Sequence, residues 1–217
     1  MKLSKELFQY DEVNRIYLLS DKGVIAIACA VKKALKEMKI HEEYLFVNRL
    51  SEGCLKYRFS IYFSKEIEHF VDIYGDSPHY FLDFEYNRTS CNLKIIDKAI
   101  YDDPKNEVAI KKGLTRFDMV IHQRSEHNEF PENLLHFEFK GIKNKKGINN
   151  DIKRVSLTTL EAQNPLAVRY GVVSEGGSRK AVVRGYQLGF VIKFNKQDTK
   201  SKVVSIRNGK VVECCAV

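Results

Sequence analysis

Two segments in the first third of the chain carry hydrophobic side chains at the spacing of a helix. In residues 23–38, small or apolar side chains recur every four positions along one side, which predicts a helix. From residue 51 to about residue 70, hydrophobic positions recur at intervals of three and four, and they are Leu55, Phe59, Tyr62, Phe63 and Ile67. Ser51 is a residue type that favours the N-cap. The pattern therefore predicts two helices before residue 71.

The hydrophobic period changes to two in the middle of the chain. Residues 80–86, 117–121 and 135–139 each show this alternation, which is typical of strands. The polar stretch 125–133 joins the last two of them. We therefore expect these two strands to form an antiparallel hairpin.

The last third of the chain predicts one helix and four further strands. Residues 150–162 show a helical pattern that ends before Pro165, because a residue before proline disfavours the helical conformation. The strands predicted after this helix are 169–174, 182–194, 203–206 and 211–214. Asn208-Gly209, which joins the last two, is typical of a tight hairpin turn. No linker, repeat or low-complexity tract interrupts the chain, so we expect a single α/β domain over residues 1–217.

Length and composition fit an ordinary globular domain. The 217 residues are 44% hydrophobic and 29% charged, which argues against disordered, collagen-like and coiled-coil classes. The longest apolar run, residues 24–31, has eight residues, whereas a bilayer span needs about 20, so we expect no membrane segment. The N-terminus lacks an apolar stretch of the signal-peptide type, and the five cysteines show no Cys-x-x-Cys spacing. We therefore expect a cytoplasmic protein with reduced thiols.

The positive charge of the protein is concentrated in its last third. The net charge is +8, and residues 140–217 hold 16 basic and 5 acidic side chains, whereas residues 1–139 hold 20 and 23. A basic segment of this kind attracts polyanions, nucleic acid first among them. The alternative is a solvated basic face that serves solubility.

A carboxylate and an ammonium group share one side of a predicted strand. Glu138 and Lys140 are two residues apart, so their side chains project to the same face, and the predicted hairpin can bring Asp118 beside Glu138. Two neighbouring carboxylates can bind Mg²⁺, and a nearby lysine can orient water or stabilise charge on a phosphate. The set suits metal-dependent phosphodiester hydrolysis. The alternative is an edge strand whose polar face is simply solvated.

Four short motifs follow one another between residues 52 and 140. They are Glu52 with Tyr57-Arg58, the run Asp83-Phe84-Glu85-Tyr86-Asn87-Arg88, the run Thr115-Arg116-Phe117-Asp118-Met119-Val120-Ile121-His122, and the run Asn133-Leu134-Leu135-His136-Phe137-Glu138-Phe139-Lys140. In this order they resemble the PD-(D/E)XK, or restriction-endonuclease-like, nucleases, and among these the small bacterial members. The resemblance covers about residues 50–194.

Two positions depart from the family pattern. Phe117 stands where the family has a proline, a residue that holds shape and takes no part in the chemistry. Tyr57 stands where it has a histidine. If that histidine contacts phosphate in the relatives, the contact is altered in this chain.

The resemblance implies a fold and a division of the chain. The fold is a restriction-endonuclease-like core with a central mixed sheet of four to five strands flanked by helices. The core would span about residues 50–194, after an N-terminal helical extension (residues 1–50) and before a C-terminal hairpin (residues 200–215).

The resemblance also implies a metal site. Asp118 and Glu138 would ligate Mg²⁺ or Mn²⁺, together with the backbone carbonyl of Phe139. Lys140 would position the attacking water. Glu52, on the preceding helix, would complete the acidic cluster, and its alternative is a solvent-facing helix acid.

The expected partner is nucleic acid, most readily DNA, and a homodimer would allow both strands to be cut. The side chains expected to hold nucleic acid are Arg58, Arg88, Lys143, Lys145, Lys146 and Lys153. Arg88 has an alternative as an ion-pair partner of Glu85 or Asp83. His122 and His136 either border the site or are hydrogen-bonded structural residues.

Two functions remain open from the sequence. The first is a metal-dependent nuclease acting on DNA. The second is a binding module of the same fold that holds nucleic acid or a partner protein without cutting it. Asp118, Glu138 and Lys140 together favour the nuclease, because a binding module has no need for all three.

Overall fold

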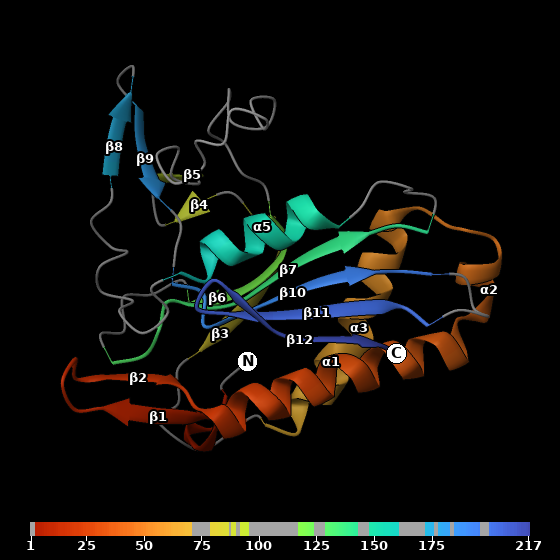
Figure 1. The fold of residues 1–217 in the computed structure, drawn as a ribbon, viewed down its shortest axis with the longest axis horizontal. Coiled ribbons are helices and arrows are strands. Elements are labelled where there is room, and N and C mark those ends of the chain that lie inside the picture. Colours follow the sequence, from red (N-terminus) through yellow and green to blue (C-terminus); the bar gives the residue numbers. More distant parts are fainter. Residues whose placement is uncertain are drawn as a thin grey trace.

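The computed structural model describes most of the chain. The described residues are 3–70, 79–86, 88–89, 92–95, 117–123, 129–142, 148–160, 172–175, 178–182, 185–195 and 200–217. Within them the protein is mixed α/β, as the sequence predicts, with a six-stranded sheet and helices on both of its faces (Figure 1).

The main sheet has the strand order β12-β11-β10-β7-β6-β3. Its strands are β3 (Tyr80–Tyr86), β6 (Phe117–Gln123), β7 (Asn133–Lys140), β10 (Leu188–Lys193), β11 (Lys202–Arg207) and β12 (Lys210–Ala216). β7 and β10 are parallel, and the other neighbours are antiparallel. The predicted hairpin of β6 and β7 is confirmed. The predicted strand number of four to five is too low, because the C-terminal hairpin β11–β12 pairs with β10 and extends the same sheet.

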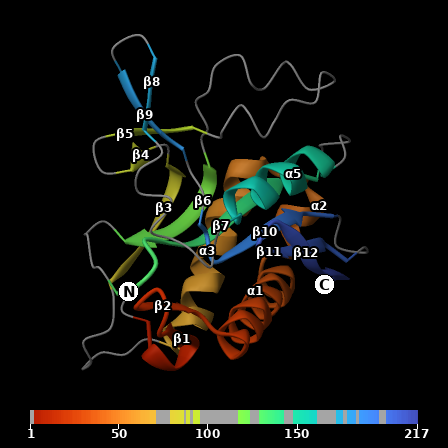
Figure 2. The ribbon, with the colours of Figure 1, turned by 60° about the vertical axis from the view of Figure 1, so that its left-hand side comes forward.

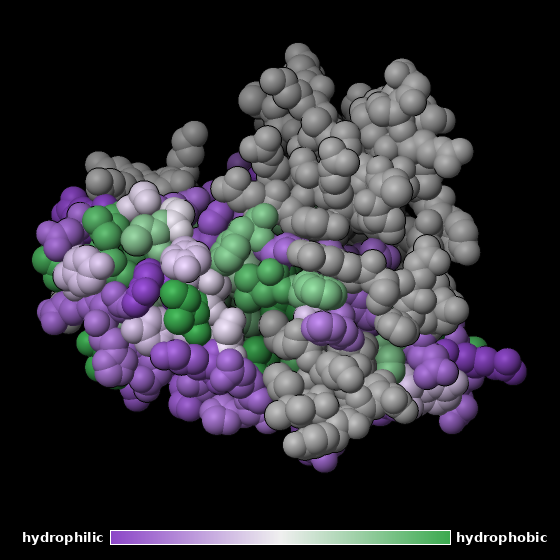
Figure 3. All heavy atoms as spheres, turned by 180° about the vertical axis from the view of Figure 1, so that it is seen from behind, coloured by the Kyte–Doolittle hydropathy of each residue, from purple (hydrophilic) through white to green (hydrophobic). Residues whose placement is uncertain are grey.

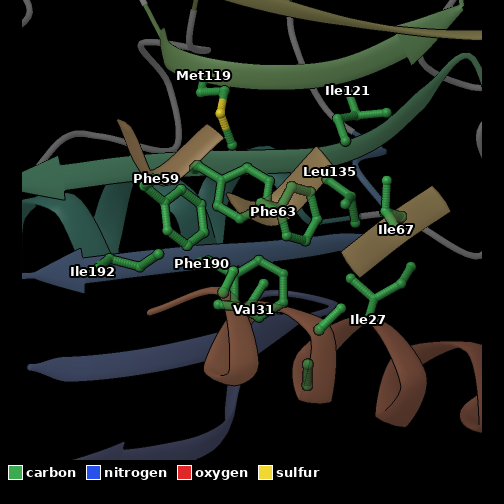
Figure 4. Packing of buried hydrophobic residues seen from close by; sticks show 14 of the residues in the cluster. Ile27, Val31, Phe59, Phe63, Ile67, Met119, Ile121, Leu135, Phe190 and Ile192 are labelled. Atoms are coloured by element: carbon green, nitrogen blue, oxygen red, sulfur yellow. The ribbon is translucent and has the colours of Figure 1, made fainter. Parts of the chain in front are cut away.

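Helices α1 (Asp21–His41) and α3 (Glu52–Glu68), joined through the short α2 (Glu43–Val47), cover one face of the sheet. Both predicted helices are confirmed, and both begin at serine caps: Ser20 Oγ accepts from the Gly23 N–H at 3.0 Å, and Ser51 Oγ accepts from the Cys54 N–H at 3.3 Å. Their buried residues pack with those of β7 and β10 in one hydrophobic cluster (Figure 4).

Helix α5 (Asn149–Thr158) covers the opposite face, over β7, β10 and β11 (Figures 1 and 2). Val155 packs there against Val191 and Val204. Gly189 of β10 permits this approach, because a Cβ on it would lie 2.1 Å from Val155 Cγ1. The predicted helix 150–162 is confirmed, although it ends earlier than expected.

Two parts of the fold differ from the sequence prediction. A hairpin of β1 (Phe8–Asp11) and β2 (Ile16–Leu19) precedes α1 and was not predicted. The predicted strand 182–194 is wrong as one element, because Gly185 adopts a left-handed φ of 78° and the chain changes sheet there. The residues before it form β9 (Ser178–Val182), which belongs to a small sheet with β4 (Arg88–Thr89), β5 (Asn92–Ile95) and β8 (Val172–Glu175).

The surface of the molecule mixes hydrophilic and hydrophobic residues, as the view from behind shows (Figure 3). Two of the exposed aromatic side chains, Tyr57 and Phe84, lie with their ring centroids 6.3 Å apart.

No helix in the described part of the chain is long and apolar enough to cross a membrane.

Candidate functional site

Asp118 lies where the strands β6 and β7 part. Their antiparallel ladder ends at the pair Met119↔Phe137, so the next residues on each strand, Asp118 and Glu138, follow side by side. Beyond that pair the Phe139 N–H donates to Asp118 Oδ2 at 2.8 Å. The backbone of β7 therefore holds the carboxylate at the open end of the ladder.

The Asp118 carboxylate also faces the amino end of α3. Lys56 Nζ lies 3.3 Å from Asp118 Oδ1, and only 8% of Lys56 is exposed. Burial raises the pKa of Asp118, and the neighbouring charge of Glu138 raises it further, whereas the Phe139 N–H and Lys56 act in the opposite direction. Sequence reasoning missed Lys56. The sequence feature that could have identified Lys56 is its helical spacing, because it lies three residues before Phe59 and seven before Phe63 and therefore on the buried side of the helix.

Glu138 is buried between its own strand and α5, with 3% of the residue exposed. Arg154 Nη1 donates to its Oε2 at 3.0 Å, and the ring of His136 lies 3.1 Å from its Oε1. Burial raises the pKa of Glu138; Arg154 opposes this rise, and the nearby charge of Asp151 supports it. A raised pKa in a cluster of charged side chains is typical of functional sites.

His136 is held in one orientation behind Glu138. Its Nδ1 lies 2.7 Å from Thr158 Oγ1, which itself lies 3.0 Å from the Val155 carbonyl. A carbonyl can only accept, so the single hydroxyl proton of Thr158 points to Val155 and its oxygen accepts from His136 Nδ1–H. Nε2 therefore faces Glu138. His136 is a hydrogen-bonded structural histidine that also borders the site.

Lys140 shares the α5 face of β7 with Glu138, as the spacing predicts. Lys140 Nζ lies 3.0 Å from Asp151 Oδ2 on α5, and Asp151 is 2% exposed. The Lys140 side chain is 22% exposed, so it remains accessible from solvent. The sequence reasoning did not identify Asp151 and Arg154 as site residues, because a helical pattern does not predict which strand residues the helix will contact.

Glu52 reaches the same end of the sheet from the first turn of α3. Its Oε2 accepts from the Gly141 N–H at 2.6 Å. Gly141 directly follows Lys140, and a Cβ on it would lie 3.2 Å from Glu52 Cβ. The structure thus brings Glu52 to the end of β7 that carries Lys140, rather than leaving it on a solvated helix face.

The residues expected to hold nucleic acid are not assembled in the same way. Arg58 pairs with Glu42 at the end of α1, and Glu42 also accepts from Tyr62 Oη at 3.3 Å. Lys153 lies on α5 beside Arg154. Lys143, Lys145 and Lys146, together with the side chain of Arg88, lie outside the described residues.

Asp83, in the run that resembles the family, lies on β3 and contacts His122 of β6. His122 Nε2 is 2.8 Å from Asp83 Oδ2, and His122 is 2% exposed. This supports the structural alternative for His122. The side chain of Glu85, the other carboxylate of that run, lies outside the described residues.

The donor set consists of oxygen atoms that suit a hard divalent cation, but several of these atoms already contact other groups of the protein. Carboxylate and carbonyl oxygens, which Asp118, Glu138 and the Phe139 backbone provide, are the ligands that Mg²⁺ prefers. Within the described residues no group of three or more His, Cys, Asp or Glu side chains is arranged to hold a metal.

Charged side chains of both signs surround this donor set. Four carboxylates meet here, those of Glu52, Asp118, Glu138 and Asp151, against the three cations Lys56, Lys140 and Arg154. Because His136 donates from Nδ1 to Thr158, its Nε2 contact with Glu138 Oε1 requires a proton on one of these two groups, so the set carries no excess of negative charge.

Comparison of the chain with protein-family models, with curated proteins and with solved structures gave no match.

Proposed function

We propose that the protein is a metal-dependent nuclease that hydrolyses phosphodiester bonds in DNA. The observation that carries this proposal is the meeting of Asp118, Glu138 and Lys140 at the open end of the β6–β7 ladder. Glu52 joins them from α3 through its bond to Gly141. These are the four residues to which the PD-(D/E)XK resemblance gives roles in catalysis. The mixed sheet, with α3 on one face and α5 on the other, is also compatible with the restriction-endonuclease-like core.

Each residue has a role that follows from its position. Asp118, Glu138 and the Phe139 carbonyl would hold Mg²⁺ or Mn²⁺, which supplies Lewis acidity and acidifies bound water. Glu52 adds negative charge at the same end and fixes the backbone after Lys140. Lys140 positions water and stabilises negative charge that develops on the phosphate. His136 and Arg154 hold the Glu138 carboxylate from behind.

The experiment is cleavage of plasmid and linear duplex DNA with Mg²⁺ or Mn²⁺, with and without a chelator. We expect the parent protein to cut and the chelator to abolish cutting. Glu138→Gln removes a ligand, so calorimetric metal binding and cleavage should both fall. Lys140→Ala keeps both carboxylates, so metal affinity should hold while cleavage falls by roughly a hundredfold or more.

Two results would contradict the proposed nuclease. Cleavage that resists chelation would exclude the metal site, and a Lys140→Ala protein that cuts at the parent rate would remove Lys140 from the chemistry. Lys36→Gln, which changes an exposed lysine on α1, is the matched control and should behave as the parent protein.

A binding module is the second candidate, and one observation favours it. Every carboxylate of the set already contacts a nitrogen donor: Asp118 with Lys56, Glu138 with Arg154, Asp151 with Lys140, and Glu52 with the Gly141 N–H. These carboxylates are thus paired with nitrogen donors of the protein itself, although the buried Asp151 Oδ2 makes no hydrogen bond. DNA binding without cleavage across a range of Mg²⁺ and Mn²⁺ concentrations would establish this function instead.

A further inference from the structure

Three lysines stand in one row across the main sheet. The parallel register of β7 and β10 pairs Lys140 with Lys193, and the antiparallel register of β10 and β11 pairs Lys193 with Lys202. Neighbouring strands are about 4.8 Å apart, so the row is about 10 Å long. Its first member, Lys140, belongs to the candidate active site.

All three side chains leave the sheet on the α5 face. Lys140 contacts Asp151 of α5. Val191 and Val204, each two residues from a lysine of the row, pack in the cluster that contains Val155 of α5, and residues two apart on a strand project to the same face. Lys193 is half-buried and Lys202 is exposed.

The row is unfavourable for the folded protein when nothing is bound. Like charges directly opposite each other on neighbouring strands repel. Asp151 neutralises Lys140, whereas in the described part of the chain neither Lys193 nor Lys202 makes an ion pair. Protection of a sheet edge, a common use of strand lysines, does not explain them, because β10 and β11 are interior strands.

We propose that Lys193 and Lys202 bind the DNA backbone as it leaves the candidate active site, each lysine contacting a phosphate. The proposal rests on the nuclease function for the nature of the ligand. A DNA strand carries one negative charge per nucleotide. Neighbouring phosphates can therefore pair with Lys193 and Lys202 while another phosphate of the same strand contacts Lys140. At an axial rise of about 3.4 Å per nucleotide, 10 Å corresponds to roughly three steps along one strand.

The test measures DNA binding separately from cleavage. A fluorescently labelled 20-base-pair duplex is titrated with protein in EDTA at several salt concentrations, and log Kd is plotted against log salt. Lys193→Thr/Lys202→Thr should weaken binding about tenfold or more and should lower the slope by about 1.8, because each lost phosphate contact removes about 0.9. Threonine is well tolerated in strands, and removal of the repulsion should leave the unfolding temperature unchanged or higher.

Lys22→Gln/Lys36→Gln is the matched control, since it removes two exposed charges from α1, on the other side of the sheet; binding and slope should stay at the parent values. If Lys193→Thr/Lys202→Thr shows the same slope of log Kd against log salt as the parent, the two lysines do not contact phosphates. The nuclease proposal is then still decided by its own cleavage test. A parent protein that binds no duplex in EDTA would overturn the phosphate row, whereas cleavage with Mg²⁺ or Mn²⁺ decides the nuclease proposal.

Discussion

At the scale of single residues, the site is a set of buried charges that are held in place by opposite charges. Asp118 and Glu138 have raised pKa values because they are buried, and each has a cation beside it, Lys56 or Arg154. Buried ion pairs contribute little net stability compared with apolar packing. Such clusters occur both in functional sites and in structural ion-pair networks, so the variants below are needed to distinguish the two.

Lys56 should compete with a metal for Asp118. Lys56→Met keeps the long side chain on the buried stripe of α3 and removes the ammonium group, so Mg²⁺ or Mn²⁺ should bind about fivefold more tightly, which corresponds to about 1 kcal/mol. The metal-free protein should be less stable than the parent, because Asp118 loses its partner. Calorimetric titration and thermal unfolding with and without Mn²⁺ measure both effects.

Lys36→Met on the exposed side of α1 is the control for the loss of one positive charge. An unchanged metal affinity in Lys56→Met would mean either that the metal does not bind Asp118 or that displacing Lys56 from Asp118 costs no free energy.

At the scale of elements, β7 connects the core to the site. Its alternate side chains Leu135, Phe137 and Phe139 belong to the large hydrophobic cluster, while the residues between them face α5. Helix α5 in turn supplies Arg154 and Asp151 to the site. The position of α5 over the sheet therefore decides the geometry of Glu138 and Lys140.

Gly189→Ala should destabilise the docking of α5. The new Cβ would lie 2.1 Å from Val155 Cγ1 and 3.0 Å from Thr159 Cγ2, so the helix must move away, at a cost of about 1–3 kcal/mol. Urea unfolding measures the change in the free energy of unfolding, and DNA cleavage should fall with it, because Arg154 and Asp151 move with the helix.

Gly53→Ala is the matched control for this substitution. Gly53 lies in the first turn of α3, and a Cβ added to it would meet no other side chain within 4 Å. The variant should be as stable as the parent or more stable by up to about 1 kcal/mol. A Gly189→Ala protein of parent stability would show that α5 does not need this close approach.

At the scale of the whole molecule, the N-terminal segment shares its core with the sheet. Ile27, Val31 and Leu35 of α1 are fully buried, in the same cluster as Phe137 of β7 and Phe190 of β10. The division into an extension of residues 1–50 and a core of residues 50–194 stays a prediction.

A protein that consists of residues 51–217 should therefore not fold on its own. Without α1 and the β1–β2 hairpin, one face of the sheet loses the apolar surface that covers it, and exposed apolar area costs about 25 cal/mol per Å². Circular dichroism during urea unfolding should show a cooperative transition for the full chain and none for the fragment. A cooperative fragment with the parent midpoint would establish the shorter core as an independent domain.

The sequence by itself determined what depends on neighbours along the chain. The period of three to four predicted α1 and α3, and the period of two predicted β6 and β7. The sequence also indicated that a hairpin of these strands can bring Asp118 beside Glu138, whereas their register, which shifts between Ile121 and His122, came from the structure. Asn208-Gly209 predicted the C-terminal turn, which Gly209 closes with a φ of 75°. The location in the cytoplasm, the metal, the DNA partner and the homodimer stay predictions.

Only the tertiary structure decided which distant residues meet. Lys56, Arg154 and Asp151 could not be assigned from the sequence, because a helix pattern shows which side is buried but not which strand it covers. The parallel pairing of β7 with β10, which aligns Lys140 with Lys193, joins segments about 50 residues apart. Such a pairing depends on the order of strands in the sheet, which is set by the packing of the whole chain rather than by any local period.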